Sequence, residues 1–149
     1  MRIALYQPDI PQNTGTIIRM AVCLGLPVDI IEPCGFIFDD KQLKRAGMDY
    51  LDKADITRHL SFKTFFENKG NSRLVLLTTK GSVPYTDFKF RSDDILLLGR
   101  ESCGVPEEVH NIVDGRVLIP MVPNERSLNV ALSCAMVTGE AMRQLNLFY

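Results

Sequence analysis

Apolar residues along the chain gather into short unbroken runs, separated by polar segments rich in glycine and proline. Such runs predict β-strands at residues 3–6, 28–31, 74–78, 95–98 and 117–119, with a further short candidate at 56–58. A strand with one wet face would alternate apolar and polar residues, and these runs do not alternate. They therefore predict strands that are covered on both faces, as in a parallel sheet.

Helix signals alternate with the strands. Asn13 precedes apolar residues at helical spacing, so it is expected to cap a helix that Gly25 ends. Two aspartates at 39–40 open a predicted short basic helix over residues 41–46, which Gly47 should end. Ser61 is expected to cap another helix that carries three phenylalanines.

Two more helices are predicted in the last third of the chain. Residues 106–113 form one, with proline in its first turn, and the other runs from near Ser127 to about Asn146. Strands that alternate with helices predict an α/β fold with crossover connections. No repeat, low-complexity tract or linker interrupts the 149 residues, so a single domain over 1–149 is expected. The apolar face of the last helix is predicted to comprise Leu128, Ala131, Leu132, Ala135, Gly139, Met142 and Leu145.

Composition narrows the class of protein. An apolar content of 46% is typical of a folded domain, and a net charge of −1 argues against a broad basic surface for nucleic acid, although a local patch would suffice. The four cysteines show no C-x-x-C spacing, so free thiols in a reducing compartment are favoured over zinc. With no run suited to a signal peptide or a membrane span, we expect a cytoplasmic protein that binds neither metal nor membrane.

Three candidate loops follow predicted strands, at residues 77–81, 98–106 and 119–129. Ligands of α/β sheets bind at the carboxyl ends of strands, so these loops predict a ligand site. Neither the G-x-G-x-x-G nor the G-x-x-x-x-G-K-[ST] pattern is present, which disfavours a dinucleotide such as NAD. The residues alone therefore indicate a ligand site without defining a reaction.

Structural roles compete with functional ones at each candidate. Ser127 could serve only as a helix cap, and Glu101 could be a solvated loop acid. Arg19, inside a largely apolar helix, could pair with a nearby carboxylate or serve function. Cys103 and Cys134 are interpreted as small packing residues, His59 and His110 as surface residues, and Lys41, Lys44 and Arg45 as a solvated helix face.

Taken together, three stretches resemble the three motifs of the SPOUT methyltransferases. They are residues 11–15 with Arg19, residues 98–106, and residues 119–129. The resemblance covers essentially the whole chain and is closest to the small tRNA ribose 2′-O-methyltransferases of the TrmL type, which modify the wobble nucleotide. The stretches 31–36, 39–41, 45–50 and 77–81 resemble the same group.

This resemblance implies a parallel-sheet α/β fold of three layers, in which the C-terminal segment forms a deep trefoil knot. It also implies that S-adenosylmethionine binds in a bent shape inside the knot, where backbone groups read the adenine and apolar side chains pack on it. The residues that match cofactor-binding positions, or lie beside them, are Leu77, Thr78, Gly99, Gly104, Ile119, Met121, Ser127, Leu128 and Asn129.

The implied reaction is metal-free transfer of the methyl group to the ribose 2′-hydroxyl of nucleotide 34, a cytidine or modified uridine, in tRNA and specifically in leucine tRNAs. Arg19 matches the family's catalytic arginine. Because an arginine stays protonated at neutral pH, we expect it to orient or stabilise the reacting oxygen rather than to act as a base. Asn13 and Glu101 are expected to shape the same pocket.

The resemblance also implies a homodimer whose active site is completed by both subunits, with the last helix and the surroundings of Arg19 as candidate interface. Two alternatives stay open: a ribosomal-RNA ribose methyltransferase of the same class, and a non-catalytic RNA- or nucleotide-binding module. The residues expected to contact tRNA are Lys41, Lys44, Arg45, Arg58, Arg19 and Arg126.

Overall fold

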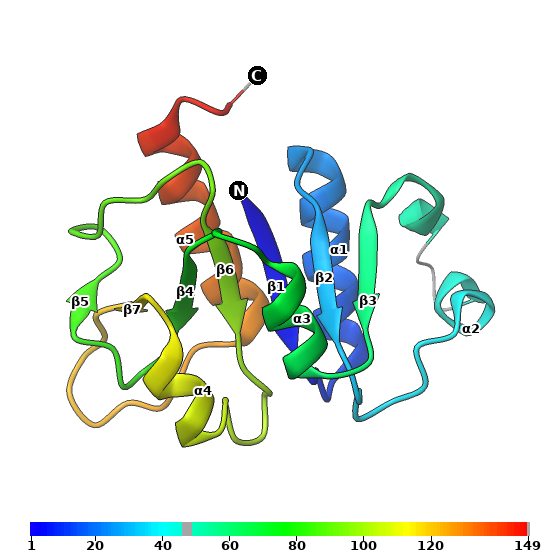
Figure 1. Cartoon of the computed structure of the whole chain (residues 1–149), viewed down its shortest axis with the longest axis horizontal. Coiled ribbons are helices and arrows are strands. Elements are labelled where there is room, and N and C mark those ends of the chain that lie inside the picture. Colours follow the sequence, from blue (N-terminus) through cyan, green and yellow to red (C-terminus); the bar gives the residue numbers. More distant parts are fainter. Residues whose placement is uncertain (46–48, 149) are drawn as a thin grey trace.

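A computed structural model describes residues 1–45 and 49–148 of the chain. Its strands form one parallel sheet in the order β3-β2-β1-β6-β4-β7-β5 (Figure 1). In chain order the strands are β1 (Arg2–Tyr6), β2 (Val28–Ile31), β3 (Ile56–His59), β4 (Leu74–Leu77), β5 (Val83–Pro84), β6 (Ile95–Leu98) and β7 (Gly115–Leu118). The α-helices are α1 (Pro11–Leu24), α2 (Asp40–Arg45), α3 (Phe62–Asn68), α4 (Glu107–Ile112) and α5 (Val130–Leu145), with a 3-10 helix η1 at Asp49–Lys53.

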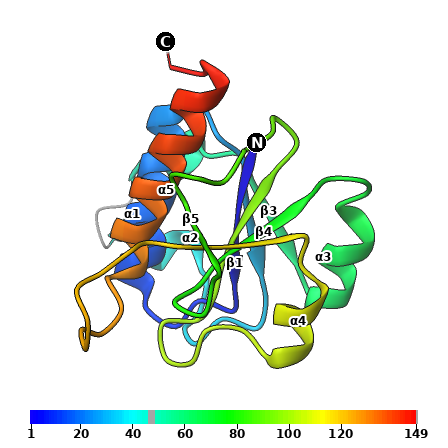
Figure 2. The same cartoon turned by 90° about the vertical axis from the view of Figure 1, so that its left-hand side faces the viewer.

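The fold has three layers, as expected. Helices α1 and α5 pack against each other on one face of the sheet, while α3 and α4 cover the other face (Figure 2). The central strands are fully buried, since every residue of β2 and β6 is excluded from solvent. Burial on both faces explains why these strands read as continuous apolar runs in the sequence.

The strand predictions are confirmed, with two corrections. The strand predicted at 117–119 begins earlier, because Gly115 and Arg116 pair with Val75 and Leu76 of β4. The two-residue strand β5 was not predicted, and its Pro84 fits the outermost position, where a missing N–H costs no ladder bond.

Two predicted helix starts are wrong in an informative way. Helix α1 begins at Pro11 with Ile10 as its cap, so the side chain of Asn13 is left for other contacts. Helix α5 begins at Val130, and the side chain of Asn129 caps it by accepting hydrogen bonds from the backbone N–H groups of Ala131 and Leu132. Ser127 therefore lies in the loop before the helix, and its predicted role as a cap is wrong.

The apolar face of α5 is also corrected. Ala131 and Met142 are buried as expected, but the side packed on the sheet continues through Cys134, Val137 and Ala141. Leu132 is 60% exposed, and Ala135 is exposed beside it. The helix thus carries a second apolar side that the protomer itself leaves uncovered.

Other predicted ends hold. Gly25 ends α1 in the left-handed conformation, and the Ser61 hydroxyl caps α3 by accepting the Thr64 N–H at 3.1 Å. The short basic helix is α2, and its predicted end at Ala46 and Gly47 lies outside the described residues.

The chain crosses the sheet at β7. This strand lies between β4 and β5, which are consecutive in the chain, while the helices on either side of β7 cover opposite faces. Gly81 presses on this strand: a Cβ there would stand 2.8 Å from the carbonyl carbon of Val117. The segment that follows β4 therefore wraps closely around β7.

Candidate active site

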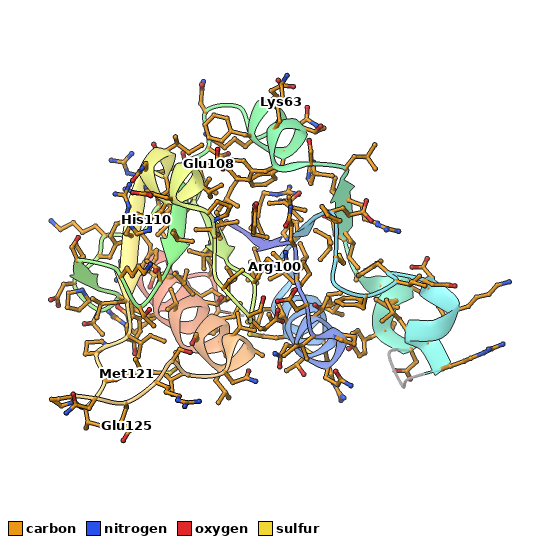
Figure 3. The ribbon with its side chains drawn as sticks, turned by 90° about the horizontal axis from the view of Figure 1, so that it is seen from below. Lys63, Arg100, Glu108, His110, Met121 and Glu125 are labelled. Carbon is orange, nitrogen blue, oxygen red and sulfur yellow. The ribbon has the colours of Figure 1, made fainter. Side chains whose placement is uncertain are left out.

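A cleft of about 1000 Å³ opens at the carboxyl ends of β4, β6 and β7. Three loops line it, at residues 77–80, 98–105 and 119–130, together with one side of α4. Figure 3 looks onto this end of the molecule, with Arg100 near the middle of the view and Met121 and His110 to its left. The carboxyl edge of the sheet thus holds a cleft at the place where the loops predicted a ligand site.

Almost all of the predicted site residues line this cleft. The nine predicted cofactor-binding residues do so, and so do Asn13 and Glu101. Arg19 is the exception, since it is not among the described residues that line the cleft. The apolar residues of the lining include Leu77, Leu98, Ile119, Met121 and Leu128.

The turn after β6 is held by its backbone. Arg100 and Gly104 exchange hydrogen bonds, with the Arg100 N–H donating at 3.0 Å and the Gly104 N–H at 2.8 Å. A Cβ at Gly99 would stand 2.6 Å from the backbone of Gly104, which a side chain cannot do. Glycine at position 99 is therefore required for the turn to close at the mouth of the cleft.

Hydrogen bonds link the turn after β6 to the start of α1 and to the loop before α5. The carboxylate of Glu101 accepts from the backbone N–H of Asp9 at 2.7 Å and from the Asn13 amide at 3.5 Å. Asn13 in turn accepts from the side chain of Asn129 at 3.0 Å. Glu101 is thus part of the site rather than a solvated acid, and the contacts reach the N-terminus of α5.

The carboxylate of Asp9 fixes the same turn from outside the cleft. It accepts two hydrogen bonds from the guanidinium of Arg100, at 3.0 and 2.6 Å. It accepts two more from the backbone N–H and the hydroxyl of Ser102, at 3.0 and 2.5 Å. The bonds from Arg100, and then those from Ser102, lower the pKa of Asp9 to about 2.

Arg19 lies elsewhere on α1. Its side chain is exposed and its guanidinium lies 5.9 Å from the ring centre of Tyr50, whose hydroxyl donates to the carbonyl oxygen of Gly15. No acidic side chain in residues 1–45 and 49–148 pairs with it. The interpretation of Arg19 as half of an intrachain ion pair is therefore wrong.

Several cleft residues were not predicted. His110 and Asn111 line the cleft from α4, and Lys80, Arg100 and Cys103 line it from the loops. His110 is thus not a plain surface residue, and Cys103 is exposed rather than packed. Pro106 was the available signal, since it starts α4 directly after the turn and brings that helix to the site.

Comparison with known proteins identifies the family. The sequence profile described as the SpoU rRNA methylase family matches residues 1–139, nearly the whole chain. The chain belongs to the SpoU methylase family. Its seven parallel strands and covering helices are therefore the SPOUT fold that the motifs implied.

Two relatives of this SpoU methylase match over nearly their full length. A tRNA (cytidine(34)-2′-O)-methyltransferase from Beijerinckia indica is 59% identical over 145 residues, covering 96% of this chain and 91% of the relative. A solved structure concerned with 2′-OH methylation of C/U34 on tRNA superposes with a TM-score of 0.89 at 41% identity, covering 97% of this chain and 95% of that one. An rRNA methyltransferase from Sinorhizobium meliloti, solved with S-adenosylmethionine, has a TM-score of 0.84 at 28% identity, but this chain covers only 56% of it.

The cleft of this methylase suits the family's cofactor, S-adenosylmethionine. Its volume lies at the upper end of the range of ligand pockets, which leaves room for a substrate beside the cofactor. Apolar side chains from Leu77, Ile119 and Leu128 offer packing for the adenine, and the loops offer backbone polar groups. Within the described residues no group of histidine, cysteine, aspartate and glutamate side chains could hold a metal ion.

Three further titratable residues of the methylase, His59, Cys34 and Cys134, do not line the cleft. His59 is buried and contacts Asp29 at 2.8 Å, and Asp29 also binds Arg2, so the prediction of a surface histidine is wrong. Burial raises the pKa of Cys34 to about 11 and that of Cys134 to about 12, which makes both thiols unreactive. Cys134 is a packing residue, as predicted.

The side chains predicted to contact RNA are exposed, and two of them form ion pairs within the chain. Lys44 pairs with Asp52 at 2.6 Å, and Arg58 pairs with Glu32 while lying over the ring of Phe38.

None of the helices in the described part of the chain has the length and apolar character that crossing a bilayer requires.

Proposed function

We propose that this SpoU methylase transfers a methyl group from S-adenosylmethionine to the ribose 2′-hydroxyl of nucleotide 34 in tRNA, a cytidine or a modified uridine. The observation that carries the proposal is that the loops at residues 77–80, 98–105 and 119–130 line one cleft, together with Asn13 of the first motif. The 59% identical relative that carries this activity in its name supports the substrate. We place the enzyme in the cytoplasm, where its tRNA substrate is found, and we propose leucine tRNAs as that substrate.

The residues of the cleft divide into two groups. Leu77, Thr78, Ile119, Met121 and Leu128 would hold the adenosine part, and the turn from Gly99 to Gly104, with Ser127 and Asn129, would hold the rest. When bound, S-adenosylmethionine supplies an activated methyl group for the ribose oxygen. Asn13 and Glu101, joined by hydrogen bonding, would orient that oxygen and exclude competing water.

Arg19 requires a second subunit in this proposal. In its own protomer it lies outside the cleft, with its guanidinium exposed on α1. We therefore infer that a homodimer brings Arg19 of one protomer to the cleft of the other, where it would stabilise the reacting oxygen. Its permanent positive charge suits this role better than proton removal.

The exposed apolar side of α5 is the proposed dimer surface. Leu132 and Met136 are 60% and 42% exposed, and Leu128 continues the surface into the preceding loop. Residues 120–129 are exposed throughout, although they border the cleft. Covering this surface with a second copy would bury apolar area and close the mouth of the site together.

The path of the chain at β7 supports the proposed trefoil knot. The chain passes from α4 on one face, through the position between β4 and β5, to α5 on the other face. Threading would fix the loops at 77–81 and 119–129 against each other. Two loops held in this way would form a rigid wall for the cofactor.

The test is methylation of defined tRNAs by the purified protein. Leucine tRNAs from cells that lack this enzyme, incubated with S-adenosylmethionine, should gain 2′-O-methylation at nucleotide 34, detected by nucleoside mass spectrometry of isolated anticodon fragments. The matched control is the same tRNA already methylated at that oxygen. Methylation of ribosomal RNA instead would support the ribosomal alternative, and cofactor binding without methylation of either RNA would support a non-catalytic module.

A further inference from the structure

Asp9 is the most heavily hydrogen-bonded carboxylate beside the cleft, although it does not line it. Its two oxygens accept four hydrogen bonds from Arg100 and Ser102. We call these three residues the Asp9 clasp. Because β1 and β6 are neighbouring parallel strands, the loops that carry Asp9 and the turn leave the sheet at the same edge. The clasp thus joins segments about 90 positions apart in the chain.

Glu101 lies between the two residues that the clasp holds. Its neighbours on either side, Arg100 and Ser102, both donate to the carboxylate of Asp9. Its own carboxylate accepts the backbone N–H of Asp9 at 2.7 Å, and its other oxygen faces Asn13. The direction of the Glu101 side chain is therefore set by the side chain of Arg100 before it, by Ser102 after it and by the contacts of its own carboxylate.

The clasp also binds the guanidinium of Arg100, the residue before Glu101. The guanidinium of Arg100 is adjacent to Glu101 in sequence and would form a strong bidentate pair with any free carboxylate. In the structure Nε and Nη2 of Arg100 both donate to the carboxylate of Asp9. With Asp9 neutral, Glu101 would be the competing carboxylate, and pairing with Arg100 would take it away from Asn13.

We propose that Asp9 is a positioning residue for methyl transfer, which keeps Arg100 away from Glu101 and so holds the Glu101 carboxylate at Asn13 in the cleft. The inference rests on the proposed function, because it concerns the rate of that reaction. The low pKa of Asp9 agrees with it, since the carboxylate stays charged across the physiological range.

The first test is Asp9→Asn, which keeps the shape of the side chain and removes its charge. We expect kcat to fall by about ten- to a hundredfold, as for other residues that orient a reacting group. The KM for tRNA and the affinity for S-adenosylhomocysteine, measured by calorimetry, should change by a smaller factor than kcat, because Asp9 does not line the cleft. A loss shared equally by kcat and ligand binding would contradict the proposal.

Two double variants separate positioning from a structural role. Asp9→Asn combined with Glu101→Gln should be no slower than Glu101→Gln alone, because Asp9 acts through Glu101. Asp9→Asn combined with Arg100→Gln should regain activity over Asp9→Asn, because the competing cation is gone. Additive losses in both double variants would overturn the inference.

A matched control is Asp94→Asn at the opposite end of β6. Asp94 accepts two hydrogen bonds from Arg73 and one from the Arg91 backbone, much like the clasp, but it lies away from the cleft. Its substitution should lower the melting temperature and leave kcat of the folded enzyme unchanged. If Asp9→Asn fails to fold, Asp9→Ser is the second variant, because it also removes the carboxylate that holds Arg100, and it should show the same non-additivity with Glu101→Gln.

The wild-type enzyme, assayed in parallel, keeps the two proposals apart. No methylation of nucleotide 34 by the wild type would contradict the proposed function. An active wild type with an equally active, folded Asp9→Asn variant would contradict the positioning role alone.

Discussion

At the scale of single residues, the cleft depends on side chains that never enter it. Asp9 holds the turn between Gly99 and Gly104 by hydrogen bonds from Arg100 and Ser102, and Gly99 allows that turn to close because it has no Cβ. Asp9 does not line the cleft and Gly99 adds no side chain to it, yet both set the positions of the residues around them. Their substitution should therefore alter rates more than it alters the overall fold.

Arg19→Ala is the residue-scale test of the chemistry. The side chain is exposed in the protomer, so its removal should change the free energy of unfolding by no more than about 0.5 kcal/mol. We expect turnover to fall by at least about a hundredfold, since a preorganised charge at the reacting oxygen is lost. Near-normal turnover, with S-adenosylhomocysteine affinity intact by calorimetry, would rule out the proposed role.

Acid stability is a second consequence of one side chain. The pKa of Asp9 in the folded chain, about 2, lies below its ordinary value of 3.8. The carboxylate therefore stabilises the fold above about pH 4, and this contribution is lost as the pH falls toward about 2. Melting temperatures measured over this range should drop more steeply for the wild type than for Asp9→Asn. Parallel curves would contradict the assignment.

At the scale of elements, the sequence predicted the strands better than the helix starts. Continuous apolar runs identified the strands, because a strand that is buried on both faces has apolar residues at successive positions. The starts of α1 and α5 were misplaced because Asn13 and Ser127 look like caps in isolation. In the folded chain Asn13 is a site residue and Asn129 is the cap, a distinction that depends on contacts more than 100 positions away.

Similar reasons explain what was missed at the site. The loops that line the cleft could be predicted from their glycines, prolines and places after strands, and their expected cofactor role came from the family resemblance. His110 lines the cleft only because α4 returns toward the turn. The exposed side of α5 could not be told from the buried side, because both carry small and apolar residues. Periodicity gives the faces of a helix but does not say which one meets the sheet.

Asn129→Ala tests the cap of α5 and its link to the cleft. Its side chain accepts the N–H groups of Ala131 and Leu132 and donates to Asn13. Loss of the cap should lower the free energy of unfolding by about 1 kcal/mol, measured by urea denaturation. Because Asn13 also loses a partner, kcat should fall in the same variant. Asn129→Asp, which keeps the capping oxygen, should recover stability but not the donor to Asn13.

At the scale of the whole molecule, two sites and one interface depend on each other. If Arg19 serves the partner's cleft, the protomer cannot be active alone. Leu132→Glu places a charge on the proposed dimer surface at a position 60% exposed in the protomer, so the protomer should fold. We expect the mass in solution to fall from dimer to monomer and methylation to be lost with it.

Leu60→Glu is the matched control for the dimer surface. Leu60 is 83% exposed, between β3 and α3 and away from α5. That variant should remain dimeric and active when assayed by light scattering and tRNA methylation. An active monomer of Leu132→Glu would contradict the role of the interface.

The strand order also determines when the sheet can be completed during synthesis. Strand β1 lies between β2 and β6, and Ile3 pairs with Leu96. Until residues 95–98 have left the ribosome, one edge of β1 has no neighbour, and unpaired edges invite aggregation. The turn that forms the cleft follows directly after that strand. A fragment that ends before residue 95 therefore exposes an unpaired strand edge to proteases and to aggregation. It also lacks the turn that lines the cleft.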